Sequence, residues 1–439
     1  MSTEPTLSFT ARYARQENSL AVPAREVQLV LGTDSLGIKF VQGEAQSYPL
    51  REVVDLVAGD YCLRLATEDG SEIILSHLGR DYENFRREMA ARRNALLLSD
   101  LLMEEPLVIG GLHGVCEYQN GAQRQVFDPT EVRLYQTALV IIPEIGTLRR
   151  VPFSDIAEIT APDFQLVVRT EYGDTFILSR LGRDLAPLKH HLDDLRHELM
   201  LKAQNLVKEL LPSAGTTTVF QLAALMKEGR AVRRRELEAL GATLWTELEQ
   251  HLTDSEAAEE YAFLKTLGRA QDISIGFKRG LKEGENDYLW FLVPIGSLDA
   301  RRPGNAAVME AVSPDGESRA TYAFRLVDRR EYPLLKTEEA LQAAVDGFLR
   351  NTNRALLAIN FRREPIYLSR EALLRPQYAR YRYAVAALPE LRALRRSFIG
   401  RIAHLSPEQW QADIMSLLAF NTAVGDNEAV WSRSGLKNC

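Results

Sequence analysis

Few residues in this chain have both the type and the spacing that chemistry requires. His190, Asp194 and His197 are separated by steps of four and three residues, so they would share one face of a helix. Such a face could offer ligands to a divalent metal. These side chains lie off the apolar stripe of the same segment, however, which favours a solvated helix face. We therefore expect no metal site and no cofactor.

A second group is the arginine- and tyrosine-rich stretch from 370 to 404, which contains eight Arg against two Glu. Cations beside aromatic rings suit phosphate contact and base stacking, as in single-stranded nucleic-acid grooves. A solvated helix face, or a surface that docks onto an acidic part of the same chain, would explain these residues equally well. The candidate contacts for an anionic ligand or a partner are Arg375, Arg380, Tyr381, Arg382, Arg392 and Arg396.

Local enzyme motifs are absent from the sequence: there is no GxGxxG, GxxxxGK[ST], HExxH or GxSxG. Sites assembled from distant residues leave no local motif, so the scan favours a non-enzymatic protein without excluding catalysis. An enzyme or small-ligand receptor stays as an alternative, with a pocket in the C-terminal half. Its candidate lining residues are Tyr288, Trp290, Tyr322, Phe324 and Arg325.

The N-terminal half of the sequence contains an internal repeat. Residues 61–81 read YCLRLATEDGSEIILSHLGRD, and residues 164–184, which lie 103 positions later, read FQLVVRTEYGDTFILSRLGRD. Further upstream the offset becomes 105, which places Glu26–Leu29 over Glu131–Leu134. A length difference in one hairpin accounts for the change. The N-terminal half is therefore expected to contain two copies of one unit.

Each copy reads as short strands followed by one long helix. In the first copy, β-rich runs at 27–30, 37–40, 61–67 and 73–75 are separated by glycines and by the Asp69-Gly70 hairpin signal. In the second copy an apolar stripe with helical spacing follows the LGRD turn. Its members are Leu185, Leu188, Leu192, Leu195, Leu199, Ala203, Leu206 and Leu210. Arg92, Arg93 and Asp100 interrupt the corresponding stripe of the first copy.

A strand meander closed by one C-terminal amphipathic helix resembles the pleckstrin-homology (PH) superfold, including its GRAM-like and bacterial PH-like versions. The resemblance rests on the strand ends 72–76 and 175–179 and on the LGRD segments that open each helix. It covers roughly residues 7–105 and 106–212, and implies two tandem PH-like β-barrel or sandwich modules. Tandem modules of this kind also occur in the middle domains of the FACT histone chaperone, which is a similarity of architecture only.

Many pleckstrin-homology domains bind phosphoinositides through basic residues between their first two strands. The matching stretches here, 16–23 and 120–129, contain only Arg124 as a basic residue. Residues 1–214 carry 22 Lys and Arg against 31 Asp and Glu, a net charge of −9, while the remaining residues are net +2. We therefore expect no phosphoinositide binding. The acidic surface favours a basic protein partner instead.

The C-terminal half begins after the boundary at 211–215. Helices are expected at 219–228, 231–252 and 255–267, within a helical segment spanning 217–268. Two hairpins follow, with strands at 273–277, 288–293, 306–312 and 319–327 and turns within 282–287 and 313–316. Residues 269–435 thus read as an α+β domain of unrecognised family with an antiparallel sheet.

These observations lead to one overall expectation. The fold class is α+β, with two PH-like modules followed by the α+β domain. The leading function is a non-enzymatic protein-interaction or scaffold role, with a protein partner; nucleic-acid binding through 370–404 is a further alternative. The chain has neither a signal-peptide pattern nor an apolar run long enough to span a bilayer, so we expect a cytoplasmic protein without membrane insertion.

Overall fold

The computed structural model of this protein describes most of the chain. The described residues are 6–422 except 18–19, 22, 42, 44, 68, 103–104, 147, 279–287, 300–301, 303 and 313–318. The predicted turns at 282–287 and 313–316 therefore lie outside the described residues. The chain forms two compact units: unit 1 is Met1–His197 with Ser369–Ala387, and unit 2 is Glu198–Leu368 with Leu388–Cys439.

Unit 1 begins with module 1, an antiparallel sheet followed by a helix. The strand order is β5-β4-β3-β1-β8-β7-β6, and the short β2 pairs with β1. Its elements are β1 (Leu7–Glu17), β2 (Leu20–Ala21), β3 (Arg25–Leu31), β4 (Ser35–Phe40), β5 (Gln46–Pro49), the 3-10 turn η1 (Leu50–Glu52), β6 (Val53–Gly59), β7 (Cys62–Thr67), β8 (Glu72–Ser76), η2 (Gly79–Asp81) and α1 (Tyr82–Leu102).

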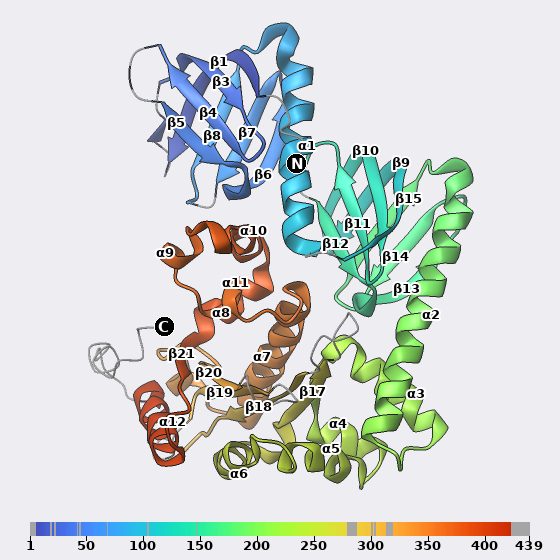
Figure 1. The fold of residues 1–439 in the computed structure, drawn as a ribbon, viewed down its shortest axis with the longest axis vertical. Coiled ribbons are helices and arrows are strands. Elements are labelled where there is room, and N and C mark those ends of the chain that lie inside the picture. Colours follow the sequence, from blue (N-terminus) through green and yellow to red (C-terminus); the bar gives the residue numbers. More distant parts are fainter. Residues whose placement is uncertain are drawn as a thin grey trace. The chain divides into compact units, whose positions relative to one another are not determined.

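Module 2 has the strand order β12-β11-β10-β9-β15-β14-β13 (Figure 1). Its elements are β9 (Leu107–Asn120), β10 (Gln123–Tyr135), β11 (Ala138–Pro143), β12 (Arg149–Pro152), η3 (Phe153–Asp155), β13 (Ile156–Thr160), β14 (Leu166–Thr170), β15 (Asp174–Ser179), η4 (Gly182–Asp184) and α2 (Leu185–Leu210). When β2 is set aside, every element of module 1 has its counterpart in module 2. The predicted repeat is confirmed as two copies of one strand order.

The repeat extends to single backbone angles. The LGRD segments form η2 and η4, directly before α1 and α2. Gly79 and Gly182 both have a φ of 57°, in the left-handed region that favours glycine. In β3 the side chains alternate between buried and outward positions, with Val27, Leu29 and Leu31 buried, whereas every residue of β11 is buried. In the described part of the chain the two sheets are open, with β5 and β6, or β12 and β13, at their edges.

Unit 2 contains the second half of α2 and a sheet in the order β16-β17-β18-β19-β20-β21. Its strands are β16 (Val232–Arg233), β17 (Ser274–Lys278), β18 (Tyr288–Ile295), β19 (Ala306–Val312), β20 (Arg319–Phe324) and β21 (Phe398–Ile402). Its helices and 3-10 turns are α3 (Thr216–Leu225), η5 (Lys227–Gly229), α4 (Arg234–Leu240), α5 (Leu244–Thr253), α6 (Ala258–Leu267), η6 (Ala270–Asp272), η7 (Tyr332–Leu334), α7 (Glu338–Ala358), α8 (Glu364–Tyr367), α11 (Pro389–Ser397) and α12 (Pro407–Thr422).

Helices cover both faces of this third sheet. On one face Tyr261 of α6 packs edge-on against Phe291, with ring centroids 5.2 Å apart, and Trp410 of α12 joins the same core. On the other face Phe348 of α7 lies 5.5 Å from the ring of Phe324. Burial on both faces explains the nearly continuous apolar runs of β18 and β19. The expected antiparallel sheet is confirmed, with β16 and β21 added at its edges.

One helix expectation in this half was wrong. The periodicity at 231–252 predicts a single helix, whereas the structure has β16, α4 and α5 there. At the start of α4 the Glu236 carboxylate accepts a hydrogen bond from the backbone N–H of Arg233 at 2.9 Å and pairs with its guanidinium, and α4 ends at Gly241. The apolar periodicity continues across this break because α4 and α5 bury their apolar faces in the same core. The apolar periodicity therefore reflects burial in one shared core and does not require one continuous helix.

Candidate functional site: a helix-bearing surface on module 1

A segment distant in sequence belongs to unit 1. Residues 369–387 form α9 (Arg370–Leu373), η8 (Pro376–Tyr378) and α10 (Ala379–Ala387). Ser369 caps α9 by accepting a hydrogen bond from the backbone N–H of Ala372. In unit 1, α10 packs against α1, η1 and β6, which together form what we call the α10 surface (Figure 1). This surface contains the densest set of buried charges in module 1.

Arg93 is the centre of the α10 surface. This α1 side chain is fully buried, and its guanidinium donates to the carbonyl oxygens of Val53 at 2.8 Å, Val54 at 2.7 Å and Gly146 at 3.3 Å. Burial lowers the pKa of the Arg93 guanidinium. The first two carbonyls belong to β6, and the third lies between β11 and β12 of module 2. The Arg93 guanidinium thus connects α1 to β6 and to module 2 through backbone carbonyl acceptors.

Aromatic side chains of α10 lie over this cation. The Arg93 guanidinium carbon is 5.7 Å from the centre of the Tyr383 ring, within the range of a cation–π contact. Burial raises the pKa of the Tyr383 hydroxyl. Tyr381 is also buried, and its ring stacks with that of Tyr378 at 6.3 Å. The α10 segment is therefore seated by aromatic contacts as well as by charge.

Two ion pairs complete the α10 surface. Arg382 of α10 pairs with Glu52 of η1. Arg51, the neighbour of Glu52, makes a two-point contact with Asp100 of α1 at 2.7 and 3.1 Å. Burial raises the pKa of Asp100 despite the Arg51 guanidinium beside it. The α10 surface therefore holds a basic segment through an acidic residue, while Arg51 and Asp100 pair with each other within the surface.

The sequence-predicted contact residues separate into two groups. Tyr381 and Arg382 lie within the contact on module 1, while Arg375 and Arg380 are exposed on the same segment. Arg392 and Arg396 are exposed on α11, which belongs to unit 2. Sequence reasoning did not identify Glu52, Arg93 and Asp100 as part of this site. Their signal was the interruption of the apolar stripe at Arg93 and Asp100, which only a second buried surface on α1 explains.

The expected aromatic pocket in unit 2 is largely filled. Tyr288 and Trp290 line a hollow of about 20 Å³, which is room for roughly one water molecule. Tyr322 and Phe324 are buried in the core, and Arg325 donates to Asn421 at 3.1 Å. Tyr322, Phe324 and Arg325 are not among the residues that line the hollow beside Tyr288 and Trp290.

A larger hollow of about 510 Å³ in unit 2 contains His404 in its wall. The imidazole nitrogens lie 3.1 Å from Glu260 of α6 and 3.1 Å from the fully buried Glu310 of β19. Burial by itself lowers the pKa of His404, but the hydrogen bonds to the two carboxylates raise it to about 9. Thr321 donates to Glu310 and accepts from the indole N–H of Trp410 at 2.8 Å. The imidazole is therefore a protonated bridge between two carboxylates at neutral pH.

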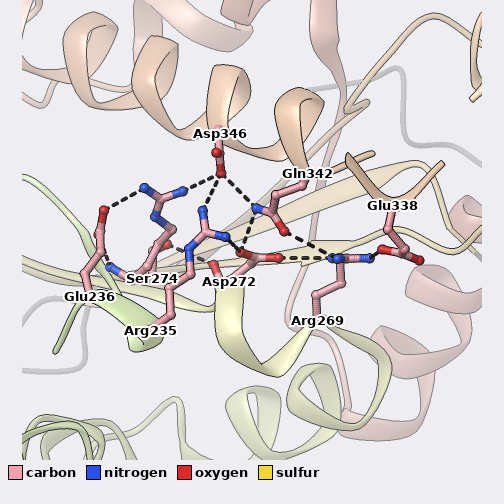
Figure 2. A network of polar contacts seen from close by, with 9 residues as sticks. Arg235, Glu236, Arg269, Asp272, Ser274, Glu338, Gln342 and Asp346 are labelled. Carbon is pink, nitrogen blue, oxygen red and sulfur yellow. Dashed lines mark hydrogen bonds and ion pairs between the residues drawn. The ribbon is translucent and has the colours of Figure 1, made fainter. Parts of the chain in front are cut away.

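A separate polar network connects α7 to the sheet edge of unit 2. Figure 2 shows Asp272 and Asp346 at its centre, with Gln342 donating to them at 3.0 and 2.8 Å. The buried Asp272 also pairs with Arg269 at 3.0 Å. Three arginines face four carboxylates here. The remaining members are Arg235, Glu236 and Glu338, which Figure 2 labels, and Arg233, which pairs with Glu236 and Asp346. Because the ion pairs connect α4, η6 and α7, we interpret the network as a brace within unit 2.

The structure places the residues considered for metal binding on an exposed helix face. His190 and Asp194 are 3.4 Å apart, and both side chains are more than half exposed. Among the described residues, no group of three or more His, Cys, Asp and Glu side chains is arranged to hold a metal ion. The described helices also include none with the length and apolar composition that crossing a bilayer requires.

Comparison with known proteins gives little beyond this. No protein-family model matches the chain, and no curated protein matches its sequence. A solved structure of the Spt16D Pob3N heterodimer is similar at 13% sequence identity, with a TM-score of 0.15, and the match covers 38% of this chain and 84% of that chain. We draw no structural or functional argument from this match.

Proposed function

We propose that this chain is a non-enzymatic protein-interaction or scaffold protein, whose tandem acidic PH-like modules bind a basic protein partner. One observation supports the proposal most directly: α10, a basic and tyrosine-bearing helix, is seated on module 1 through Arg382 and Glu52. The chain thus carries an example of the ligand chemistry that the α10 surface accepts. A partner helix with the same chemistry would compete with α10 for this surface.

The PH-like interpretation of the two modules supports the same role. Each copy has an open antiparallel sheet followed by one long helix, which is the element order that the resemblance implies, without the closed barrel. The −9 net charge of residues 1–214 attracts basic surfaces and repels anionic ones. The domain boundaries near 105 and 212, the cytoplasmic location and the absence of phosphoinositide binding remain predictions.

The test uses a full-chain variant, called the vacated chain, in which substitutions release α10 from the α10 surface. Arg382→Glu combined with Tyr383→Ala removes the ion pair and the ring over Arg93. A fluorescein-labelled peptide of residues 369–387 should then bind at least about tenfold more tightly than to the wild type, because the attached segment competes at roughly millimolar effective concentration. Fluorescence anisotropy measures the affinity, and circular dichroism checks that the variant is folded.

Two matched variants sharpen this test. Arg375→Glu changes an exposed charge of the same segment and should leave the surface occupied, so the peptide should bind as weakly as to wild type. Adding Glu52→Lys to the vacated chain should weaken peptide binding again. A folded vacated chain that does not bind the peptide would contradict the proposal.

Nucleic-acid binding through 370–404 stays as the alternative, and the same chains test it. Tyr381 and Tyr383 are buried against module 1, so base stacking on them requires α10 to leave its surface. A single-stranded oligonucleotide that binds the wild type, and loses affinity with Tyr381→Ala and with rising salt, would favour this alternative.

A further inference from the structure

The two modules expose an aromatic ring at the same hairpin tip. Tyr61 lies between β6 and β7, and Phe164 lies 103 residues later between β13 and β14. Their exposed fractions are 77% and 90%, the highest among the aromatic side chains that the structure describes as exposed. Each ring directly follows an aspartate, Asp60 or Asp163. The repeat thus presents one Asp-aromatic pair per module.

In both pairs the aromatic residue has a backbone conformation that its residue type disfavours. Asp60 and Tyr61 have φ values of 50° and 54°, and Asp163 and Phe164 have 48° and 58°. Two successive left-handed residues make the turn that usually takes Asn-Gly or Asp-Gly, with glycine in the second position. An aromatic residue with a positive φ is an outlier.

In the neighbouring hairpin of each module, a glycine occupies the turn position that has a positive φ. In the β7–β8 and β14–β15 turns, Gly70 and Gly173 have φ values of 82° and 89°. Burial does not compensate at the aromatic tips, because the Tyr61 ring only touches Tyr82, at 5.6 Å, and Phe164 is almost fully exposed. Outliers that the fold does not require point to a binding role.

From this geometry we infer that the two tips, Asp60-Tyr61 and Asp163-Phe164, are equivalent contact points for lysine or arginine side chains of a protein partner. A carboxylate next to an open aromatic ring offers a cation both an ion pair and a cation–π contact. The acidic charge of residues 1–214 selects the same partner chemistry. The inference rests on the proposed basic partner, but its site is separate from the α10 surface.

The test measures binding of a labelled peptide of alternating arginine and glycine to the full wild-type chain at physiological salt. The double variant Tyr61→Gly and Phe164→Gly should weaken binding by about threefold or more, the loss expected for exposed cation–π contacts. Its melting temperature should be unchanged or higher, since glycine suits both backbones. Asp60→Asn with Asp163→Asn should also weaken binding, while Tyr61→Phe should retain it.

The control is Val41→Gly, which removes a side chain that is 81% exposed away from the tips and should not change binding. Equal affinity of the wild type and the double glycine variant, or no binding by either, would overturn the inference. So would tip-dependent binding to phosphatidylcholine vesicles, which would show that the rings meet lipid instead. Binding of the 369–387 peptide to the vacated chain tests the α10 surface separately, so the two proposals can fail independently.

Discussion

The helices α1 and α2 occupy equivalent positions in modules 1 and 2. Their N-terminal halves have the same buried positions, and their C-terminal halves have different contacts. Their first turns agree: Phe85 and Met89 of α1 are fully buried, as are Leu188 and Leu192 of α2 at the equivalent positions. Further along, Asp100 of α1 corresponds to Ala203 of α2. Asp100 pairs with Arg51 beside α10, whereas Ala203 packs against the apolar core of unit 2.

The same difference is seen at one pair of equivalent arginines in the two helices. Arg93 of α1 donates to the carbonyl oxygen of Val53, the first residue of β6. Arg196 of α2 donates to the carbonyl oxygen of Ile156, the first residue of β13. Arg93 has two more carbonyl acceptors and lies under Tyr383, while Arg196 is only partly buried. The conserved contact maintains the module, and the additional contacts of Arg93 adapt the first copy to receive α10. Equivalent positions of the two modules therefore have different neighbours, α10 in module 1 and the core of unit 2 in module 2.

The largest expected effect separates these two arginines. Arg93→Ala should lower the free energy of unfolding of unit 1 by roughly 3–5 kcal/mol, because it removes a fully buried side chain together with its three hydrogen bonds to backbone carbonyls. Arg196→Ala should cost only about 1 kcal/mol. Urea unfolding followed by far-ultraviolet circular dichroism measures both. The three described Trp residues, Trp245, Trp290 and Trp410, lie in unit 2, so their fluorescence should be nearly unaffected by Arg93→Ala. Equal costs would refute the distinction.

The next effect tests where the helices agree. Met89→Ala and Leu192→Ala should each cost about 2–5 kcal/mol, the range for truncating a fully buried side chain. Leu195→Ala should cost less, since the structure leaves this member of the predicted stripe only half-buried. The same dichroism titration provides the comparison. A larger loss for Leu195→Ala than for Leu192→Ala would mean that the buried face of α2 lies elsewhere.

A third prediction contrasts the fully buried Arg93 with His404, the partly buried, titrating cation of unit 2. The folded pKa of about 9 lies above the unfolded value near 6.5. The stabilisation is therefore fully present below about pH 6.5 and is lost as pH rises through 9, amounting to about 2–3 kcal/mol. Tryptophan fluorescence in urea at several pH values measures it. His404→Gln should flatten this profile, and an unchanged slope in that variant would assign the pH dependence to other groups.

The smallest effect concerns the contact between α10 and η1. A double-mutant cycle of Glu52→Gln and Arg382→Gln should give a coupling energy of about 1 kcal/mol, because both side chains are partly solvated. Circular dichroism in urea again provides the free energies. The same cycle with Glu52 and the exposed Arg375 should give no coupling. Coupling at Arg375, or none at Arg382, would place the α10 contact differently.

Much of the fold could be predicted from the sequence because its signals are local. The repeat is a direct identity of residues at an offset of 103, and the strands follow from alternation and turn glycines. The extra strands of the third sheet were missed because β16 and β21 are short and flanked by helices. The tip aromatics Tyr61 and Phe164 opened the matching repeat segments, but nothing in the sequence showed that their backbones are left-handed.

The sequence by itself determined the duplicated module, its acidic charge and the basic, tyrosine-rich character of residues 370–404, because these properties belong to neighbouring residues. Only the tertiary structure decided that residues 369–387 pack with unit 1, and that Arg93 and Asp100 are buried there. A charge on a helix looks solvated in sequence. Whether it is buried depends on carbonyls and carboxylates that arrive from distant segments, here from β6, η1 and the loop after β11.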